Sequence, residues 1–151
     1  MKKRIVVISV LAVLVALLSV AAFAQDEPVL KQYKVVNENG KEVLVSAEHV
    51  KLGDVIEYRA TFTNRQKFNL PNVALVIPVP KGTQWVSGSA TPEVQQASVD
   101  GKSFSALPLR VTRSNGVEEV VPTSAYRALR WIFPVVKPGQ TVTAKMRVVV
   151  S

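Results

Sequence analysis

From residue 29 onward, apolar and polar residues alternate along much of the chain, with the period of two that is typical of half-buried β-strands. Segment 55–64 shows this alternation most clearly. One face carries Ile56, Tyr58, Ala60 and Phe62, and the other carries Glu57, Arg59, Thr61 and Thr63. We predict that the first face is buried and that the second faces water, as in an antiparallel sheet. Segment 141–150 alternates in the same way and should bury Val142, Ala144, Met146, Val148 and Val150.

Turn residues divide the chain into short strands, and no segment has a convincing helical period. The segments expected to form strands are 29–36, 42–47, 55–64, 73–79, 84–87, 94–99, 102–104, 107–113, 117–121, 126–133 and 141–150. Asn39-Gly40, Asp100-Gly101 and Asn115-Gly116 are hairpin signals, because these residues tolerate the backbone of tight turns. Segment 73–79 is apolar on both faces, which favours a central strand. Pro134 is expected to interrupt the strand at 126–133. Strands spaced by about 8–12 residues predict a sandwich or a barrel.

The first 24 residues have the features of a signal peptide. The basic residues at positions 2–4 precede an uncharged apolar run at 5–23, and Ala22 and Ala24 place small residues where signal peptidase needs them. Cleavage would leave a chain that begins at Gln25. An uncleaved membrane anchor is the alternative, because the run exceeds the roughly 7–15 residues of an ordinary signal-peptide core and approaches the roughly 20 that span a bilayer. Both interpretations predict export, to the periplasm, the cell surface or the medium.

The formal net charge is +8, and it falls to +5 when the three basic residues at positions 2–4 are removed with the signal peptide. A basic exported protein is expected to meet an envelope protein or an anionic envelope polymer, and not nucleic acid. The favoured interpretation of the charge itself is that it keeps the domain soluble. Cleavage would make the membrane a transient contact, through the signal peptide alone. The chain has no cysteine, which excludes thiol catalysis, disulfide exchange and cysteine-ligated zinc.

Several short motifs follow one another in an order that a known family also shows. They are Leu52-Gly53-Asp54-Val55-Ile56-Glu57-Tyr58, Thr61-Phe62-Thr63-Asn64, Leu70-Pro71-Asn72-Val73, Ile77-Pro78-Val79-Pro80-Lys81-Gly82-Thr83, Ser87-Gly88-Ser89-Ala90-Thr91-Pro92, Trp131 and Val136-Lys137-Pro138-Gly139-Gln140. Over residues 51–151 the chain resembles the conserved-repeat domain of bacterial and archaeal cell-surface proteins, a domain of unknown function, although Leu52 stands where that family usually has proline. The resemblance implies an immunoglobulin-like antiparallel β-sandwich without known catalysis. It would follow a signal-peptide helix at 1–24 and an N-terminal hairpin at 25–50.

No set of residues with the spacing of a catalytic or metal site stands out. His49 is the only histidine, and it lies beside Glu48 in a predicted loop with no nucleophile motif nearby. A zinc site needs three or four ligands, which one histidine without cysteine does not supply in the usual way. A pair of carboxylates for glycoside hydrolysis would be possible in three dimensions, but no spacing marks one. We therefore expect no enzyme, no cofactor and no metal, with a small hydrolase as a rival interpretation.

The predicted function is binding or scaffolding through sheet edges and loops. The candidates for contact with a ligand or partner are Trp85, Arg110, Arg113, Arg127 and Arg130. Trp85 would be the stacking residue of a carbohydrate-binding module, one alternative function, although a core or rim position is favoured for it. The arginines are three residues apart within each pair, so on regular strands the members face opposite sides. A membrane-anchored assembly subunit with an uncleaved N-terminal helix is the other alternative, and Trp131 is expected in the core beside Leu129.

Overall fold

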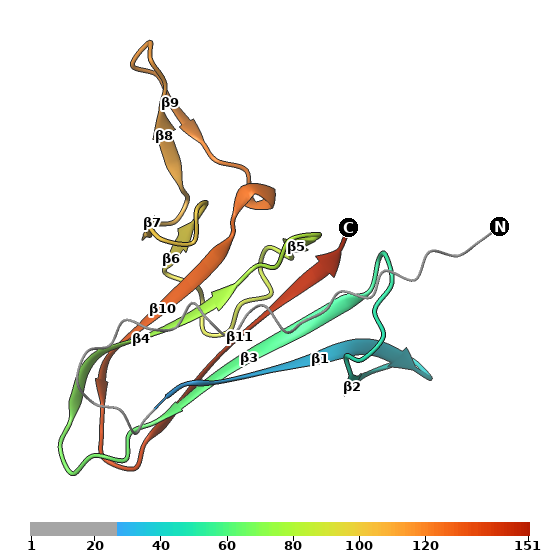
Figure 1. The fold of residues 1–151 in the computed structure, drawn as a ribbon, viewed down its shortest axis with the longest axis vertical. Coiled ribbons are helices and arrows are strands. Elements are labelled where there is room, and N and C mark those ends of the chain that lie inside the picture. Colours follow the sequence, from blue (N-terminus) through green and yellow to red (C-terminus); the bar gives the residue numbers. More distant parts are fainter. Residues whose placement is uncertain (1–26) are drawn as a thin grey trace.

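Strands β3 (Val55–Thr63) and β11 (Thr141–Val150) form the centre of a five-stranded antiparallel sheet, sheet A, whose order is β2-β1-β3-β11-β5 (Figure 1). The computed structural model describes residues 27–151, so the signal-peptide and cleavage predictions at Ala22, Ala24 and Gln25 lie outside the described residues. The other strands of sheet A are β1 (Val29–Glu38), β2 (Lys41–Ser46) and β5 (Thr83–Trp85). The predicted hairpin at Asn39-Gly40 joins β1 to β2, with φ angles of 52° and 79°.

Sheet B has the order β4-β10-β6-β7 and packs against sheet A. Its strands are β4 (Leu70–Pro78), β10 (Ala128–Val136), β6 (Gln96–Ser98) and β7 (Ser105–Ala106). A separate two-stranded sheet contains β8 (Arg110–Thr112) and β9 (Glu118–Val120), and a short 3-10 turn, η2 (Thr123–Ala125), leads from β9 towards β10. The prediction of an all-β antiparallel sandwich is therefore confirmed.

Three strand predictions are wrong in detail. Segment 73–79 was expected to be central, but β4 is an edge strand that, within the part of the chain that the structure describes, pairs only with β10. Segment 102–104 is not a strand, because the partner of β6 begins later, at Ser105. Strand β10 is not interrupted at Pro134 and pairs with β4 as far as Val136. Strand β6 pairs with β10 only up to Arg130, so one side of β10 is open at Pro134 and needs no N–H donor there.

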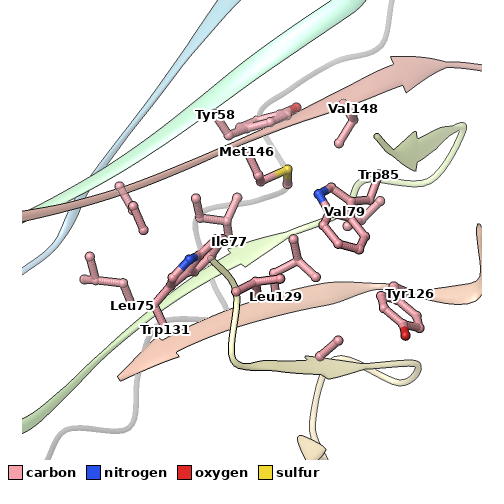
Figure 2. Close-up of a cluster of buried hydrophobic side chains, with 14 of the residues drawn as sticks. Tyr58, Leu75, Ile77, Val79, Trp85, Tyr126, Leu129, Trp131, Met146 and Val148 are labelled. Carbon is pink, nitrogen blue, oxygen red and sulfur yellow. The ribbon is translucent and has the colours of Figure 1, made fainter. Parts of the chain in front are cut away.

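The core lies between the two sheets. In Figure 2, Tyr58, Met146 and Val148 of sheet A face Ile77, Leu129 and Trp131 of sheet B. The predicted burial of the apolar faces of β3 and β11 is confirmed, since Ile56, Tyr58, Ala60, Phe62, Val142, Ala144, Met146, Val148 and Val150 are all buried. Trp131 is 1% exposed, which confirms its predicted place in the core. Its indole N–H donates to the carbonyl of Pro92 at 2.8 Å, so the one polar atom of the ring is satisfied.

Candidate partner-binding site

The hairpin predicted at Asn115-Gly116 forms a ribbon that projects away from both sheets (Figure 1). We call residues 110–120, with β8 and β9, the ribbon. Every residue in this range is exposed, and among residues 27–151 β8 and β9 pair only with each other. At the tip, the N–H of Arg113 donates to the carbonyl of Val117 at 2.9 Å, and the N–H of Gly116 donates to the carbonyl of Arg113 at 2.9 Å. The ribbon is thus well formed but has almost no core of its own.

The root of the ribbon is anchored in the sandwich. Leu109, the residue before β8, is 6% exposed, and its N–H donates to the hydroxyl of Tyr126 at 3.2 Å. The N–H of Val121, the residue after β9, donates to the carbonyl of Leu109 at 2.8 Å. The ring of Tyr126 stacks on Trp85 at a centroid distance of 5.9 Å. Core residues therefore fix the direction in which the ribbon leaves the sandwich.

The ribbon carries apolar side chains in water. Val111, Val117 and Val120 are 46%, 52% and 55% exposed. Because side chains alternate along a strand, Val111 lies on the face that also carries Arg113 and Glu119, whose side chains form an ion pair at 2.6 Å. The opposite face carries Val120 with Arg110, Thr112 and Glu118. Both faces are therefore mixed, and both outer edges have unpaired backbone groups.

The structure does not bring the five predicted contact residues together. Arg110 and Arg113 lie on the ribbon, on opposite faces as expected. The guanidinium of Arg130 lies 4.3 Å from the ring centre of Phe104, and its Nε donates to Gln96 at 2.6 Å. Arg127 donates to the carbonyls of Ser124 and Tyr126 at 3.1 and 3.0 Å. Arg127 and Arg130 thus stabilise the structure around them, and the four predicted arginines form no common basic face.

Trp85 is 9% exposed and lies in the core, against Tyr126 (Figure 2). A carbohydrate-stacking residue must present one face of its ring to the ligand, and Trp85 does not do so here. Among residues 27–151, its indole nitrogen is the one buried side-chain atom without a hydrogen-bond partner. The ring therefore serves the root of the ribbon by stacking, although its N–H is unsatisfied.

The open edges of the two sheets differ in how well they are protected. Strand β4 carries Pro71 and Pro78, and β5 and β7 have only three and two residues. Proline and short length both discourage the addition of a foreign strand. Strand β2 has neither protection, and its residues 43–45 are apolar and half-buried. It is the second place, after the ribbon, where an added strand would find unpaired backbone groups.

An ion-pair network on the outer face of sheet A was missed in the sequence. Glu57 was expected to face water, but its residue is only 3% exposed. Its carboxylate accepts from Arg59 Nε at 2.6 Å and from Arg147 Nε at 3.1 Å, and Arg147 also bonds Glu42 at 2.7 Å. Burial alone would raise the pKa of Glu57, but the hydrogen bonds and charges of Arg59 and Arg147 outweigh it and hold the pKa below its ordinary value of 4.5.

The Glu57→Gln variant is expected to be less stable than the wild type at neutral pH, by about 1–3 kcal/mol, because two arginines lose a charged acceptor. Folding lowers the pKa of Glu57, so its contribution is fully present above about pH 4.5 and is lost as the pH falls through the folded-state value. The difference between the variant and the wild type should therefore shrink between about pH 5 and pH 3. Urea unfolding across this range measures it.

The variant comparison is needed because other acids also titrate in this range. Backbone N–H groups of Ser103 and Lys102 lower the pKa of Asp100 to about 2, which affects the acid unfolding of the wild type as well. Glu38→Gln, at an exposed position of the β1 end, is the control and should leave stability unchanged at neutral pH. A stability difference for Glu57→Gln that stayed constant from pH 7 to pH 3 would contradict the assignment.

The other candidates for chemistry are separate from one another. His49 lies exposed in the loop between β2 and β3. Residues 27–151 contain no group of three or more histidine or acidic side chains that could hold a metal ion. A shallow hollow beside β1 is lined mainly by apolar side chains such as Ile56 and Val150. Residues 27–151 also contain no helix that is long and apolar enough to cross a membrane.

Comparison of the chain with protein-family models, curated protein sequences and solved structures found no match in any of the three. The resemblance to the conserved-repeat domain of cell-surface proteins therefore stays a prediction.

Proposed function

We propose that the chain is an exported, non-catalytic, immunoglobulin-like module that binds a protein of the cell envelope through the ribbon. The observation that carries this proposal is a fully exposed two-stranded hairpin on a buried root. An isolated two-stranded hairpin is marginally stable in water, and additional strands or a packed face would stabilise it. A partner strand added to either free edge of the ribbon supplies an additional strand and side chains that pack against the ribbon.

The chemistry of the ribbon suits strand addition. The unpaired N–H and C=O groups along β8 and β9 supply main-chain hydrogen bonds, and alternate side chains supply specificity. The exposed valines would lose water on binding, and burial of a valine side chain contributes about 1.5–3 kcal/mol when complete. The contacts of Leu109 with Tyr126 and Val121 already fix the root, so less conformational entropy is lost on binding than for a free loop.

Replacement of residues 110–120 by a short Gly-Ser linker is expected to abolish partner binding and leave the sandwich folded. Leu109 and Val121, which contact the core, stay in place. The first measurement is thermal unfolding, in which the melting temperature should change by no more than a few degrees. The second is co-sedimentation with the envelope fraction of the host, which should be lost in the linker variant.

A photo-crosslinking residue identifies the binding surface directly. Placed at Val117, which is 52% exposed on the ribbon, it should yield one dominant adduct with an envelope protein. Val135 is the matched control, because it is also a valine, is 50% exposed and lies on β10, away from the ribbon. Equal adducts at the two positions, or undiminished co-sedimentation of the linker variant, would contradict binding through the ribbon.

A further inference from the structure

Three basic residues form a row across the outer face of sheet A. Lys31 of β1 lies directly opposite Arg59 of β3, and Arg59 lies directly opposite Lys145 of β11. We call these three residues the basic row. Like charges that face each other across neighbouring strands destabilise a sheet. A row of three is thus an unfavourable arrangement for the free protein and a favourable one for an anion that lies along it.

Arg59 at the centre of the row is held in place and still has free donors. Its Nε donates to Glu57 at 2.6 Å, and its guanidinium lies 5.4 Å from the ring centre of Tyr33. Within residues 27–151, the two terminal nitrogens of Arg59 have no hydrogen-bond partner. These nitrogens carry the paired N–H groups that bind phosphate or carboxylate oxygens. Because the side chain is already oriented, little rotamer entropy would be lost when an anion binds.

The charges that surround the row are largely neutralised. Arg147 is paired with Glu57 and Glu42, with distances of 3.1 and 2.7 Å. By contrast, Lys31 and Lys145 form no ion pair with any residue in the described range 27–151. On the side of the row away from Glu57 and Arg147, the next residues on the same face of β3 and β11 are Thr61 and Thr143, which lie opposite each other and are neutral. The uncompensated positive charge therefore lies at Lys31 and Lys145, the two ends of the row, while Arg59 between them shares the carboxylate of Glu57 with Arg147.

We propose that the basic row binds a linear polyanion whose chain runs across β1, β3 and β11, with anionic groups at Lys31, Arg59 and Lys145. Directly opposite residues of antiparallel strands are about 4.5–5.5 Å apart, so the three cations cover roughly 10 Å, which is longer than one small anion. A bilayer surface is flat and would meet the exposed carboxylate of Glu42 as well as the row. A chain of anionic groups meets the row alone.

The test uses long-chain polyphosphate as the probe and calorimetry of the purified protein at low and at physiological salt. The Lys31→Ser/Lys145→Ser double variant should bind polyphosphate at least about tenfold more weakly than the wild type. The control is Lys81→Ser/Lys102→Ser, which removes the same charge at exposed positions outside the row and should change the affinity by less than about threefold. The linker variant without the ribbon should bind polyphosphate like the wild type. Failure of the basic row to bind polyphosphate would therefore leave the proposed function of the ribbon unaffected.

A second readout needs no ligand. At low salt and without polyphosphate, the Lys31→Ser/Lys145→Ser variant should melt at a higher temperature than the wild type, because repulsion within the row is relieved, and the control variant should not. Equal losses of polyphosphate affinity in the two double variants would show that net charge alone binds the polymer and would overturn the proposal. Row-dependent binding to vesicles of anionic lipid without binding to polyphosphate would also overturn it, in favour of a membrane surface.

Discussion

Replacement of Trp131 by alanine is expected to lower the free energy of unfolding by about 3–5 kcal/mol, because the change removes a large side chain from a close-packed core. Trp131 is 1% exposed and lies on β10, where it faces the side chains of sheet A (Figure 2). The variant also loses the hydrogen bond from the indole to the carbonyl of Pro92. A loss of this size is a large fraction of the roughly 5–15 kcal/mol that stabilises an ordinary domain, so urea unfolding should show a markedly lower midpoint.

Two further variants separate packing from the hydrogen bond. Trp131→Phe keeps most of the ring volume but not the donor, and it should cost about 1–2 kcal/mol. Val135→Ala changes an exposed residue of the same strand and should have an effect within about 0.5 kcal/mol. If Trp131→Ala and Val135→Ala had similar effects, Trp131 would not be the core residue that the structure shows.

The Asn64→Asp variant is expected to be destabilised by about 2–4 kcal/mol at neutral pH, although the two side chains have nearly the same shape. Asn64 is fully buried at the end of β3. Its side-chain amide donates to the carbonyls of Phe68 and Val136 at 2.9 and 2.8 Å, and its oxygen accepts from the N–H of Gln66 at 2.9 Å. A carboxylate would face two carbonyl oxygens with no proton to donate.

The same variant should recover part of its stability in acid. A carboxyl group at this position is protonated more readily than in water, because burial and the two carbonyl oxygens both disfavour its charged form. Its folded-state pKa is therefore raised, and the destabilisation should be smallest at low pH and grow as the pH rises through that value. Asn69→Asp, an exposed change in the same loop, is the control. Equal stability of the two variants from pH 4 to pH 8 would contradict the role of Asn64.

Local alternation was enough to predict the two central strands of sheet A. In β11, every second residue is buried as predicted, because the period of two follows directly from the geometry of an extended chain. The position of a strand within its sheet is not a local property. Strand β4 is apolar on both faces, yet it is an edge strand, and its Val76 is only half-buried on the outer face. Likewise, continuation of β10 past Pro134 depends on where β6 ends.

The candidate sites were predictable to different degrees. The hairpin at Asn115-Gly116 was predicted from its turn residues, but its projection from the sandwich depends on the absence of any strand beside β8 and β9 within the described chain. The network around Glu57 depends on the register of β3 with β11, which brings Arg147 opposite Glu57 from far along the chain. The sequence shows Glu57 and Arg59 two residues apart on one face of a strand, but it does not show that Arg147 lies beside Glu57. The same register creates the basic row.

The position of β11 has a consequence for the order in which the protein can fold during synthesis. Strand β11 contributes the last residues of the sandwich and lies between β3 and β5, so sheet A has a gap until about residue 150 has left the ribosome. The ribbon, the β1–β2 hairpin and the β1–β3 pair join strands that are close in sequence and can form early, whereas the other edge of β3 must wait for β11. A nascent or truncated chain that ends before β11 would therefore present β3 as an open apolar edge, and premature termination should yield aggregates in place of a smaller folded domain.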